Sequence, residues 1–127
     1  MCAAVADYRP ASREPAKIKR KSSELSLRLV QNPDLLAEIG RSRLTSRPLL
    51  IGFALESASG AELVNLARGK LASKRVDAVV ANMDREAIGT DDTRAVLVTE
   101  DAERALGPGP KSVVSEAIVD FIVERLG

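Results

Sequence analysis

Residues 49–56 read LLIGFALE, an almost continuous run of apolar side chains that follows Pro48. A run of this length and composition predicts a buried strand over residues 49–55. Gly52 lies inside the run, which indicates that another backbone or a ligand approaches the strand closely there. Because both faces of such a strand must be covered, the flanking sequence decides the fold class.

The segments on either side of this run alternate between helix and strand. The spacing is helical over residues 59–74, and residues 76–82 (VDAVVAN) and 94–100 (RAVLVTE) predict two more strands. Residues 2–6 (CAAVA) predict a first strand, and a terminal helix is expected to begin near residue 111, after the chain-breaking GPGP at 107–110. This alternation predicts an α/β fold with a mainly parallel sheet and flanking helices.

Two further segments precede the 49–55 strand. Residues 25–29 (LSLRL) alternate strictly between apolar and polar, and with KIKRK at 17–21 they predict an antiparallel hairpin over 16–30 that projects from the core. A short helix is expected to follow, with Asn32 as its cap, Pro33 at its first position, and Leu35, Leu36 and Ile39 on its apolar face.

Composition excludes several classes of function. The 127 residues suit one domain, and 19 basic against 18 acidic residues leave a net charge of +1, so no global field attracts nucleic acid or membrane. The chain has no histidine, which excludes Ser-His-Asp and Cys-His nucleophiles and histidine-ligated metals, whereas a carboxylate site for a hard cation stays open. The single cysteine, Cys2, and the absence of a membrane-spanning run favour the cytoplasm.

Several polar clusters are candidate ligand contacts. KIKRK is either a solvated face, a phosphate-binding segment or, as the weakest alternative, a nucleic-acid patch. Lys70 and Lys74 lie one helical turn apart and allow the first two interpretations. Asp7, Phe53 and Asn82 each end or nearly end a predicted strand. Ligands of open α/β sheets bind beyond the carboxyl ends of the strands. The loop over 83–93 is either a simple turn or a lid over a substrate.

The motifs also form a familiar ordered set. The segments AAVADYRP, KIKRK, LSLRLVQNPDLLAEIG, LLIGFALES, ARGKLASK, DAVVANM and IGTDDTRAVLV together resemble phosphopantothenoylcysteine synthetases, the ligase part of DNA/pantothenate metabolism flavoproteins. The resemblance covers essentially all of residues 1–127 and identifies them with the carboxy-terminal portion of that domain. It implies a Rossmann-like sheet that is incomplete at its amino-terminal side, and a projecting flap over 9–30 through which a homodimer forms.

The resemblance implies a reaction and a set of partners. The family joins 4′-phosphopantothenate to cysteine with CTP, through an acyl-cytidylate, and Mg²⁺ assists. Carried over by position, Lys17 is the catalytic residue, acting on the CTP phosphates or on the acyl-cytidylate. The resemblance implies nucleotide contacts at Ala3, Asp7, Pro33, Asp34, Leu35, Leu36, Phe53, Lys70 and Lys74. It assigns no metal ligands.

The sequence also departs from the family pattern. Leu55 stands where the family has alanine, Met83 follows Asn82 where aspartate is usual, and the loop before IGTDD is short. The amino-terminal half of the family's domain, with its phosphopantothenate site, has no counterpart here. We therefore expect no ligase activity from this chain alone, and expect a separate amino-terminal half as a partner. The alternative is a non-catalytic nucleotide-binding or interaction module with the same fold.

Overall fold

The computed structural model describes residues 5–19, 23–83 and 89–127, and these form two compact units. One unit runs up to Asp34 and is called the arm; the other runs from Leu35 to Gly127 and is called the sheet unit. The predicted strand over 2–6 falls largely outside the described residues, and residues 5–6 are not part of a strand.

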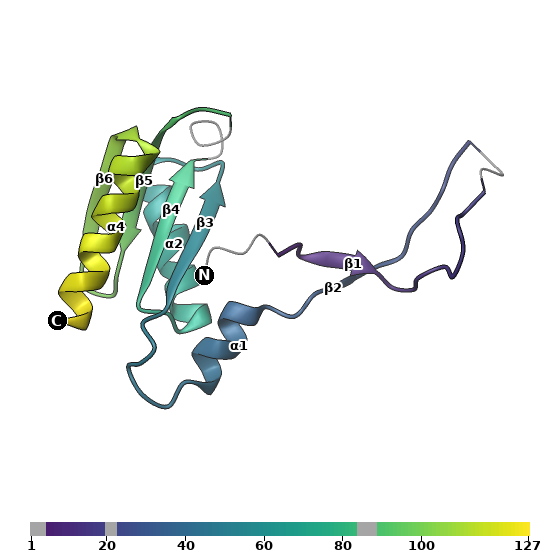
Figure 1. Ribbon diagram of the computed structural model, residues 1–127, viewed down its shortest axis with the longest axis horizontal. Helices are drawn as coiled ribbons and strands as arrows, with labels where there is room; N and C mark the ends of the chain where they lie inside the picture. Colours follow the sequence, from purple (N-terminus) through teal and green to yellow (C-terminus); the bar gives the residue numbers. More distant parts are fainter. Residues whose placement is uncertain (1–4, 20–22, 84–88) are drawn as a thin grey trace. The chain divides into compact units, whose positions relative to one another are not determined.

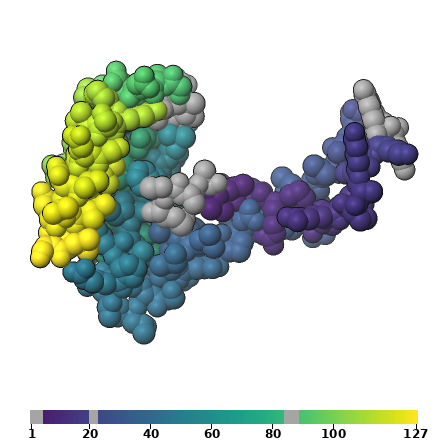
Figure 2. Space-filling model, in the orientation of Figure 1, coloured from purple at the N-terminus to yellow at the C-terminus, as the bar shows by residue number. Residues whose placement is uncertain are grey.

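The arm is held by one short pair of strands. β1 (Tyr8–Pro10) and β2 (Leu29–Gln31) pair antiparallel, with Tyr8 opposite Gln31 (Figure 1). The Arg9 guanidinium donates to the Gln31 carbonyl at 2.8 Å and to Asn32 Oδ1 at 3.0 Å. The observed strand pairing therefore lies outside most of the hairpin predicted over 16–30. Strand pairing lies at the base of the arm, whereas residues 16–19 and 23–28 are not in a strand. The described residues of the arm are purple to blue in Figure 2.

The sheet unit is built on a four-stranded sheet with the order β3-β4-β5-β6. β3 spans Ile51–Glu56, β4 Ala78–Met83, β5 Asp92–Val98 and β6 Glu103–Pro110. β3 and β4 are parallel and joined by α2 (Gly60–Lys74), as the alternating pattern predicted. β5 pairs antiparallel with both β4 and β6, so the sheet is mixed, and the expectation of a mainly parallel sheet is wrong for these strands.

Short connections explain the antiparallel half of the sheet. Only residues 84–91 separate β4 from β5 along the chain, which is shorter than the crossover of about a dozen residues that parallel neighbours need. Residues 99–102 join β5 to β6 in a tight turn, in which the Thr99 amide donates to the Ala102 carbonyl at 2.9 Å. Neighbouring strands that are joined by such short connections pair antiparallel, because the chain reverses its direction without a crossover.

β6 is the strand that the sequence pattern did not predict, because GPGP was interpreted as a break. Proline is tolerated on an edge strand, and β6 lies at the edge of the sheet. Gly107 has φ +115°, and a Cβ there would lie 2.9 Å from the Thr93 carbonyl oxygen. Glycine is therefore required where the register shifts between Thr93 and Ala95.

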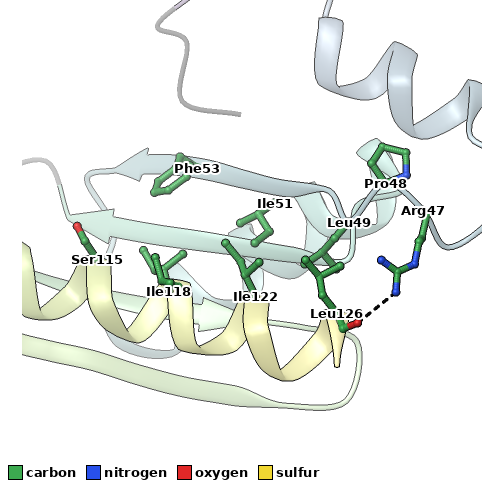
Figure 3. Close-up of a pocket in the computed structure, with 10 residues that line it drawn as sticks. Arg47, Pro48, Leu49, Ile51, Phe53, Ser115, Ile118, Ile122 and Leu126 are labelled. Carbon is green, nitrogen blue, oxygen red and sulfur yellow. Dashed lines mark hydrogen bonds between the residues drawn. The ribbon is translucent and has the colours of Figure 1, made fainter.

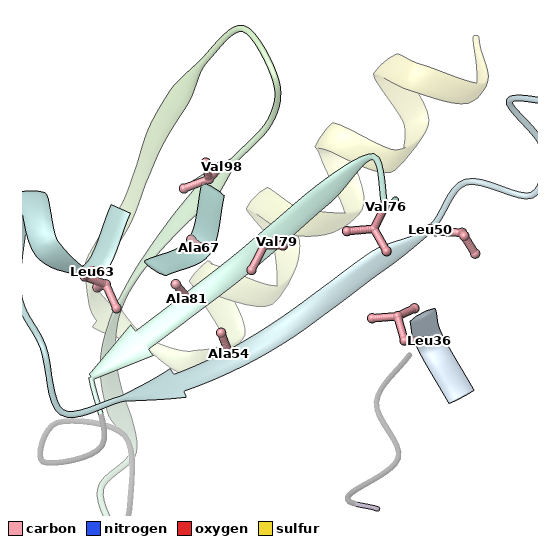
Figure 4. Close-up of a cluster of buried hydrophobic side chains, with 9 residues drawn as sticks. All are labelled: Leu36, Leu50, Ala54, Leu63, Ala67, Val76, Val79, Ala81 and Val98. Atoms are coloured by element: carbon pink, nitrogen blue, oxygen red, sulfur yellow. The ribbon is translucent and has the colours of Figure 1, made fainter. Parts of the chain in front are cut away.

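Helices cover both faces of the sheet, and each face has its own core. On one face, α2 and α1 (Leu35–Ser42) pack against the strands (Figure 4). This core consists of Leu36, Leu50, Ala54, Leu63, Ala67, Val76, Val79, Ala81 and Val98. On the other face lies α4 (Lys111–Leu126), yellow in Figure 2, which buries Val114 and Phe121 against a second core. The helix-covered α/β fold is confirmed.

The position of α1 depends on glycines at two close approaches. α1 begins at Leu35, two residues later than the predicted start at Pro33. A Cβ at Gly40 would lie 1.9 Å from the Lys74 carbonyl oxygen, so only glycine lets α1 approach the end of α2. A Cβ at Gly52 would lie 3.0 Å from Leu36 Cδ2, so the close approach predicted at Gly52 is made by a side chain of α1.

A half-buried ion pair joins α1 to the starts of β3 and β4. The Arg43 guanidinium contacts both oxygens of Asp77, at 2.5 and 3.2 Å. Asp77 also accepts from the Leu50 amide at 2.7 Å, and Arg43 donates to the Pro48 carbonyl at 2.9 Å. These bonds fix the amino-terminal ends of the two parallel strands, so that their carboxyl ends also come into register.

Candidate functional site

The carboxyl ends of β3 and β4 form the candidate site of the sheet unit. The two strands are parallel and end together, with Leu55 opposite Asn82 and Glu56 opposite Met83. Ligands of α/β sheets bind at such strand ends, because the backbone diverges there into loops and helix starts. The sequence predicted Phe53 and Asn82 at or near strand ends. In the structure Asn82 is the next-to-last residue of β4, whereas Phe53 is the third of the six residues of β3.

Lys70 of α2 reaches this end of β3. Its ammonium nitrogen lies 2.5 Å from Glu56 Oε1, and the Lys70 and Glu56 side chains are 39% and 21% exposed. Lys74 follows one turn later on the same helix, and its backbone carbonyl faces Gly40 of α1. The two lysines predicted to bind phosphate therefore share one helix, and one of them is directed to the strand end. A cation held there favours an anionic ligand.

Phe53 lies on the opposite face of β3, toward α4. It is 49% exposed and lines an apolar groove of about 1000 Å³ between β3 and α4 (Figure 3). The groove is also lined by Leu49, Ile51, Ser115, Ile118, Val119, Ile122 and Leu126, with Arg47 and Pro48 at one end. Arg47 closes that end by donating to the Leu126 carbonyl at 3.3 Å. An exposed aromatic ring on an apolar wall can accept a flat or apolar group.

Asn82 is held by a neighbour on β5. Its amide nitrogen donates to Thr93 Oγ1 at 3.3 Å, and Thr93 is 5% exposed. This bond leaves the Asn82 side chain half-buried at the carboxyl end of β4. The loop predicted over 83–93 falls partly outside the described residues. Asp92 begins β5, and Asp91 is exposed and accepts from the Lys111 amide at 2.9 Å through its carbonyl.

The arm carries the other predicted site residues. Asp7 is exposed at the base of the arm, where its carbonyl accepts from the Asn32 amide at 2.7 Å. Lys17, Pro33 and Asp34 are also exposed, and Ala3 lies outside the described residues. Asn32 donates its side-chain amide to the Ala6 carbonyl at 2.6 Å, so it ties the two segments of the arm together rather than capping α1 directly.

Two predicted contacts on α1 differ in exposure. Leu35 is 44% exposed, whereas the Leu36 side chain is 6% exposed and belongs to the core beside Gly52. Any contact of Leu36 with a nucleotide would therefore use its backbone. Sequence reasoning passed over Glu56. The alternation within GFALE was the available signal, because it places Glu56 on the same face as Ala54 and thus toward α2.

The described residues contain no cluster of three or more cysteine, aspartate or glutamate side chains that could hold a metal ion. Mg²⁺ commonly keeps several waters and takes one or two carboxylates together with substrate phosphates. The donor set seen here does not form a protein cage for it. No described residue is therefore assigned as a Mg²⁺ ligand. No helix in the described part of the chain has the length and apolarity needed to span a bilayer.

A family model, curated protein sequences and solved structures were each found to be similar to this chain. Residues 1–126 match the family model of the DNA/pantothenate metabolism flavoprotein C-terminal domain. The chain is 32% identical over 126 residues to the coenzyme A biosynthesis bifunctional protein CoaBC of Haemophilus influenzae, covering 98% of this chain and 30% of that protein. The fold matches the DNA/pantothenate metabolism flavoprotein of Streptococcus pneumoniae with a TM-score of 0.75 and 24% identity, covering 95% of this chain and 60% of that one.

A second solved structure, the C-terminal domain of CoaBC, matches with a TM-score of 0.65 and 26% identity, over 96% of this chain and 51% of that one. The chain thus spans about a third of the length of its CoaBC relatives, at their carboxy-terminal part. Because the family model matches nearly every residue, the chain belongs to the DNA/pantothenate metabolism flavoprotein C-terminal domain family.

Proposed function

We propose that this chain contributes the CTP-binding part of a phosphopantothenate–cysteine ligase of coenzyme A biosynthesis. The observation that carries the proposal is the family match over residues 1–126, together with relatives named as coenzyme A biosynthesis bifunctional proteins. Lys70 of α2 supports the proposal, because its ammonium group lies at the carboxyl end of β3, where an anionic substrate would need a cation. The proposed location is the cytoplasm, as the lone cysteine indicated.

The proposed reaction has two steps. The carboxylate of 4′-phosphopantothenate attacks the α-phosphorus of CTP, which forms an acyl-cytidylate and releases pyrophosphate. The amine of cysteine then attacks the acyl carbon, which forms the amide bond and releases CMP and a proton. Negative charge accumulates on phosphate oxygens in the first step, and positioned cations lower the energy of such a transition state. Mg²⁺ would accompany the phosphates.

The chain's own residues take distinct parts in this proposal. Lys70 and Lys74 would attract the CTP phosphates to the sheet unit, and Phe53 would offer its exposed ring to the base side of the nucleotide. In the arm, Lys17 would act on the phosphates or the acyl-cytidylate, and Asp7 would accept hydrogen bonds from the nucleotide. Ala3, Pro33, Asp34, Leu35 and Leu36 are the remaining proposed nucleotide contacts.

The edge of the sheet supports the need for a second half. β3 is an edge strand of the described sheet, and Phe53 and Leu55 on it are 49% and 52% exposed. The apolar groove runs along this edge. Sheet edges with apolar surface are normally covered in folded proteins. We propose that the amino-terminal ligase half of the longer relatives covers β3 and the groove, whether it is supplied in the same polypeptide or separately.

The arm supports the proposed homodimer. Ile18, Leu25, Leu27 and Leu29 are each more than half exposed in the single chain. Four exposed apolar side chains within residues 18–29 are typical of a surface that a partner covers. The proposed dimer therefore forms through the flap at 9–30. Replacing Leu25 and Leu27 by glutamate would then convert a dimer into a monomer, as measured by light scattering after gel filtration.

The reaction is tested with purified chain, CTP, 4′-phosphopantothenate, cysteine and Mg²⁺. We expect no pyrophosphate release from this chain alone, and pyrophosphate and CMP release once the amino-terminal half of a relative is added. Loss of this restored activity in Lys17→Gln would assign the catalytic role. Activity of the chain alone would contradict the requirement for a second half.

The alternative proposal is a non-catalytic nucleotide-binding or interaction module with the same fold. Titration calorimetry separates the two proposals. Binding of CTP without turnover, even with the amino-terminal half present, would support the module. Turnover in the same mixture would support the ligase.

A further inference from the structure

Glu56 has a contact that none of the predicted roles explains. Its carboxylate lies 2.5 Å from the Lys70 ammonium nitrogen, and the pair is partly exposed on both sides. Glu56 is the last residue of β3, whereas Lys70 lies well inside α2, so the pair links the end of the strand to the body of the helix that follows it. The side chains of Glu56 and Lys70 span the space between β3 and α2.

The pair lies where a ligand of this sheet would be held. Glu56 stands opposite Met83, at the point where the parallel strands β3 and β4 both end. It follows Gly52 and Ala54 on the α2 face of β3, and Ala54 is 4% exposed in the core below it. The carboxylate is therefore attached to a rigid, well-packed strand, which makes it a fixed point for a flexible lysine.

A partly exposed ion pair adds little to the stability of the fold. Water and salt weaken the attraction between the charges, and holding two long side chains in one geometry costs conformational entropy. The pair does restrict the Lys70 side chain, which otherwise samples many rotamers. The ammonium group has three donors, so one bond to Glu56 leaves two for other oxygens. Holding a cation in advance lowers the entropy lost when a ligand binds.

We propose that Glu56 is a positioning residue that holds the Lys70 ammonium group at the carboxyl end of β3, ready for the phosphate oxygens of the nucleotide. The inference rests on the proposed nucleotide site and adds to it a residue that is not itself a nucleotide contact. Glu56 acts through Lys70, so removing it has no effect on binding once Lys70 is gone.

The test combines two measurements on Glu56→Gln. The matched control is Glu62→Gln, which removes the same charge from an exposed position in the first turn of α2. In the first measurement, Lys70 is acylated with a limiting amount of an amine-reactive ester and quantified by mass spectrometry against Lys111. We expect Glu56→Gln to increase labelling of Lys70 several-fold and Glu62→Gln to leave it unchanged.

In the second measurement, CTP binding is titrated with the amino-terminal half present. We expect Glu56→Gln to weaken binding by about fivefold to tenfold and Glu62→Gln by less than about twofold. In a Lys70→Gln background, the added Glu56→Gln change has no further effect. The melting temperature of Glu56→Gln stays within about 2 °C of the parent, because the pair is partly exposed.

The outcomes separate the two proposals. If the parent protein binds CTP but Glu56→Gln binds it equally well or more tightly, the positioning role is wrong and the nucleotide site stands. If Glu56→Gln weakens binding equally with and without Lys70, the role through Lys70 is also wrong. If the parent does not bind CTP although labelling shows the pair, the nucleotide site is wrong, and the role of Glu56 falls with it.

Discussion

β3 and β4 are neighbouring parallel strands with similar apolar sequences, yet their environments differ. In β4, residues Ala78–Ala81 are each at most 2% exposed. In β3, Phe53 and Leu55 are about half exposed, although Phe53 lies directly opposite Val80 on the same face. The difference comes from position. β4 has a strand on each side and helices on both faces, whereas β3 lies at the edge beside the groove.

Similar apolar sequences therefore serve two purposes in β3 and β4. In β4 the apolar side chains stabilise the fold, because their burial removes them from water completely. In β3, one face stabilises the fold and the other is left available for a partner or a ligand. Four sets of variants test how far this division holds, beginning with the largest expected effect.

A charge introduced at the paired positions Val80 and Phe53 should have very different effects. Val80→Asp places a carboxylate at a site that is 1% exposed, and we expect a loss of more than about 4 kcal/mol and no cooperative unfolding transition. Phe53→Asp, at 49% exposure, should cost only about 1–2 kcal/mol. Urea unfolding followed by circular dichroism measures both. Equal losses would show that β3 is as buried as β4 in solution.

The contact between α1 and α2 should also be critical, because α1 covers the inner face of β3. Gly40→Ala would place a Cβ 1.9 Å from the Lys74 carbonyl oxygen, and we expect it to cost about 2–3 kcal/mol. Gly69→Ala is the control, because nothing lies within 4 Å of its Cβ position. That change should stabilise α2 by about 0.5–1 kcal/mol. Thermal unfolding distinguishes the two, and a neutral Gly40→Ala would contradict the close approach.

The half-buried ion pair at the other end of β3 should have the next largest effect. Asp77→Asn removes the charge that Arg43 contacts and weakens the bond to the Leu50 amide, so we expect a loss of about 2 kcal/mol. Asp101→Asn, at an exposed position in the β5–β6 turn, should change stability by less than about 0.5 kcal/mol. Chemical denaturation gives both values. A loss below about 0.5 kcal/mol for Asp77→Asn would show that the pair does not hold the strand starts.

Removing the exposed apolar side chains of β3 should have the smallest effect on stability, but it should weaken association with the amino-terminal half. Phe53→Ser combined with Leu55→Ser should change the unfolding free energy by less than about 2 kcal/mol, since both residues are about half exposed. Association with the amino-terminal half of a relative, measured by sedimentation velocity, should weaken. Val123→Ser, 64% exposed on α4 and outside the groove lining, should leave it unchanged. Unchanged association in the double variant would show that the edge of β3 is not the associating surface.

Sequence reasoning located most elements of the sheet unit, because their patterns are local. The helix expected over 59–74 is Gly60–Lys74, and the strand expected over 76–82 is Ala78–Met83. The expected end of the 49–55 strand differs by one residue from that of β3. The pattern missed β6, since glycine and proline usually end a strand, and only its place at the edge of the sheet makes them acceptable. The pattern also predicted a hairpin over residues 16–30, whereas the paired strands of the arm are Tyr8–Pro10 and Leu29–Gln31.

For the candidate site, the sequence supplied the residue types and the tertiary structure supplied their partners. Lys70 and Lys74 were recognisable as a pair because helical spacing brings them to one face. That Lys70 meets Glu56, or that Asn82 meets Thr93, depends on contacts between separate elements, which no local pattern contains.

The local sequence was enough to predict an α/β chain covered by helices, with a charged segment before residue 35, because hydrophobic periodicity and charge are properties of neighbouring residues. Strand order came only from the folded chain: within the described residues the sheet is mixed, β4 lies between two strands and β3 lies at the edge. Strand order and burial depend on which distant segments pack together, and two strands of similar sequence can differ in both.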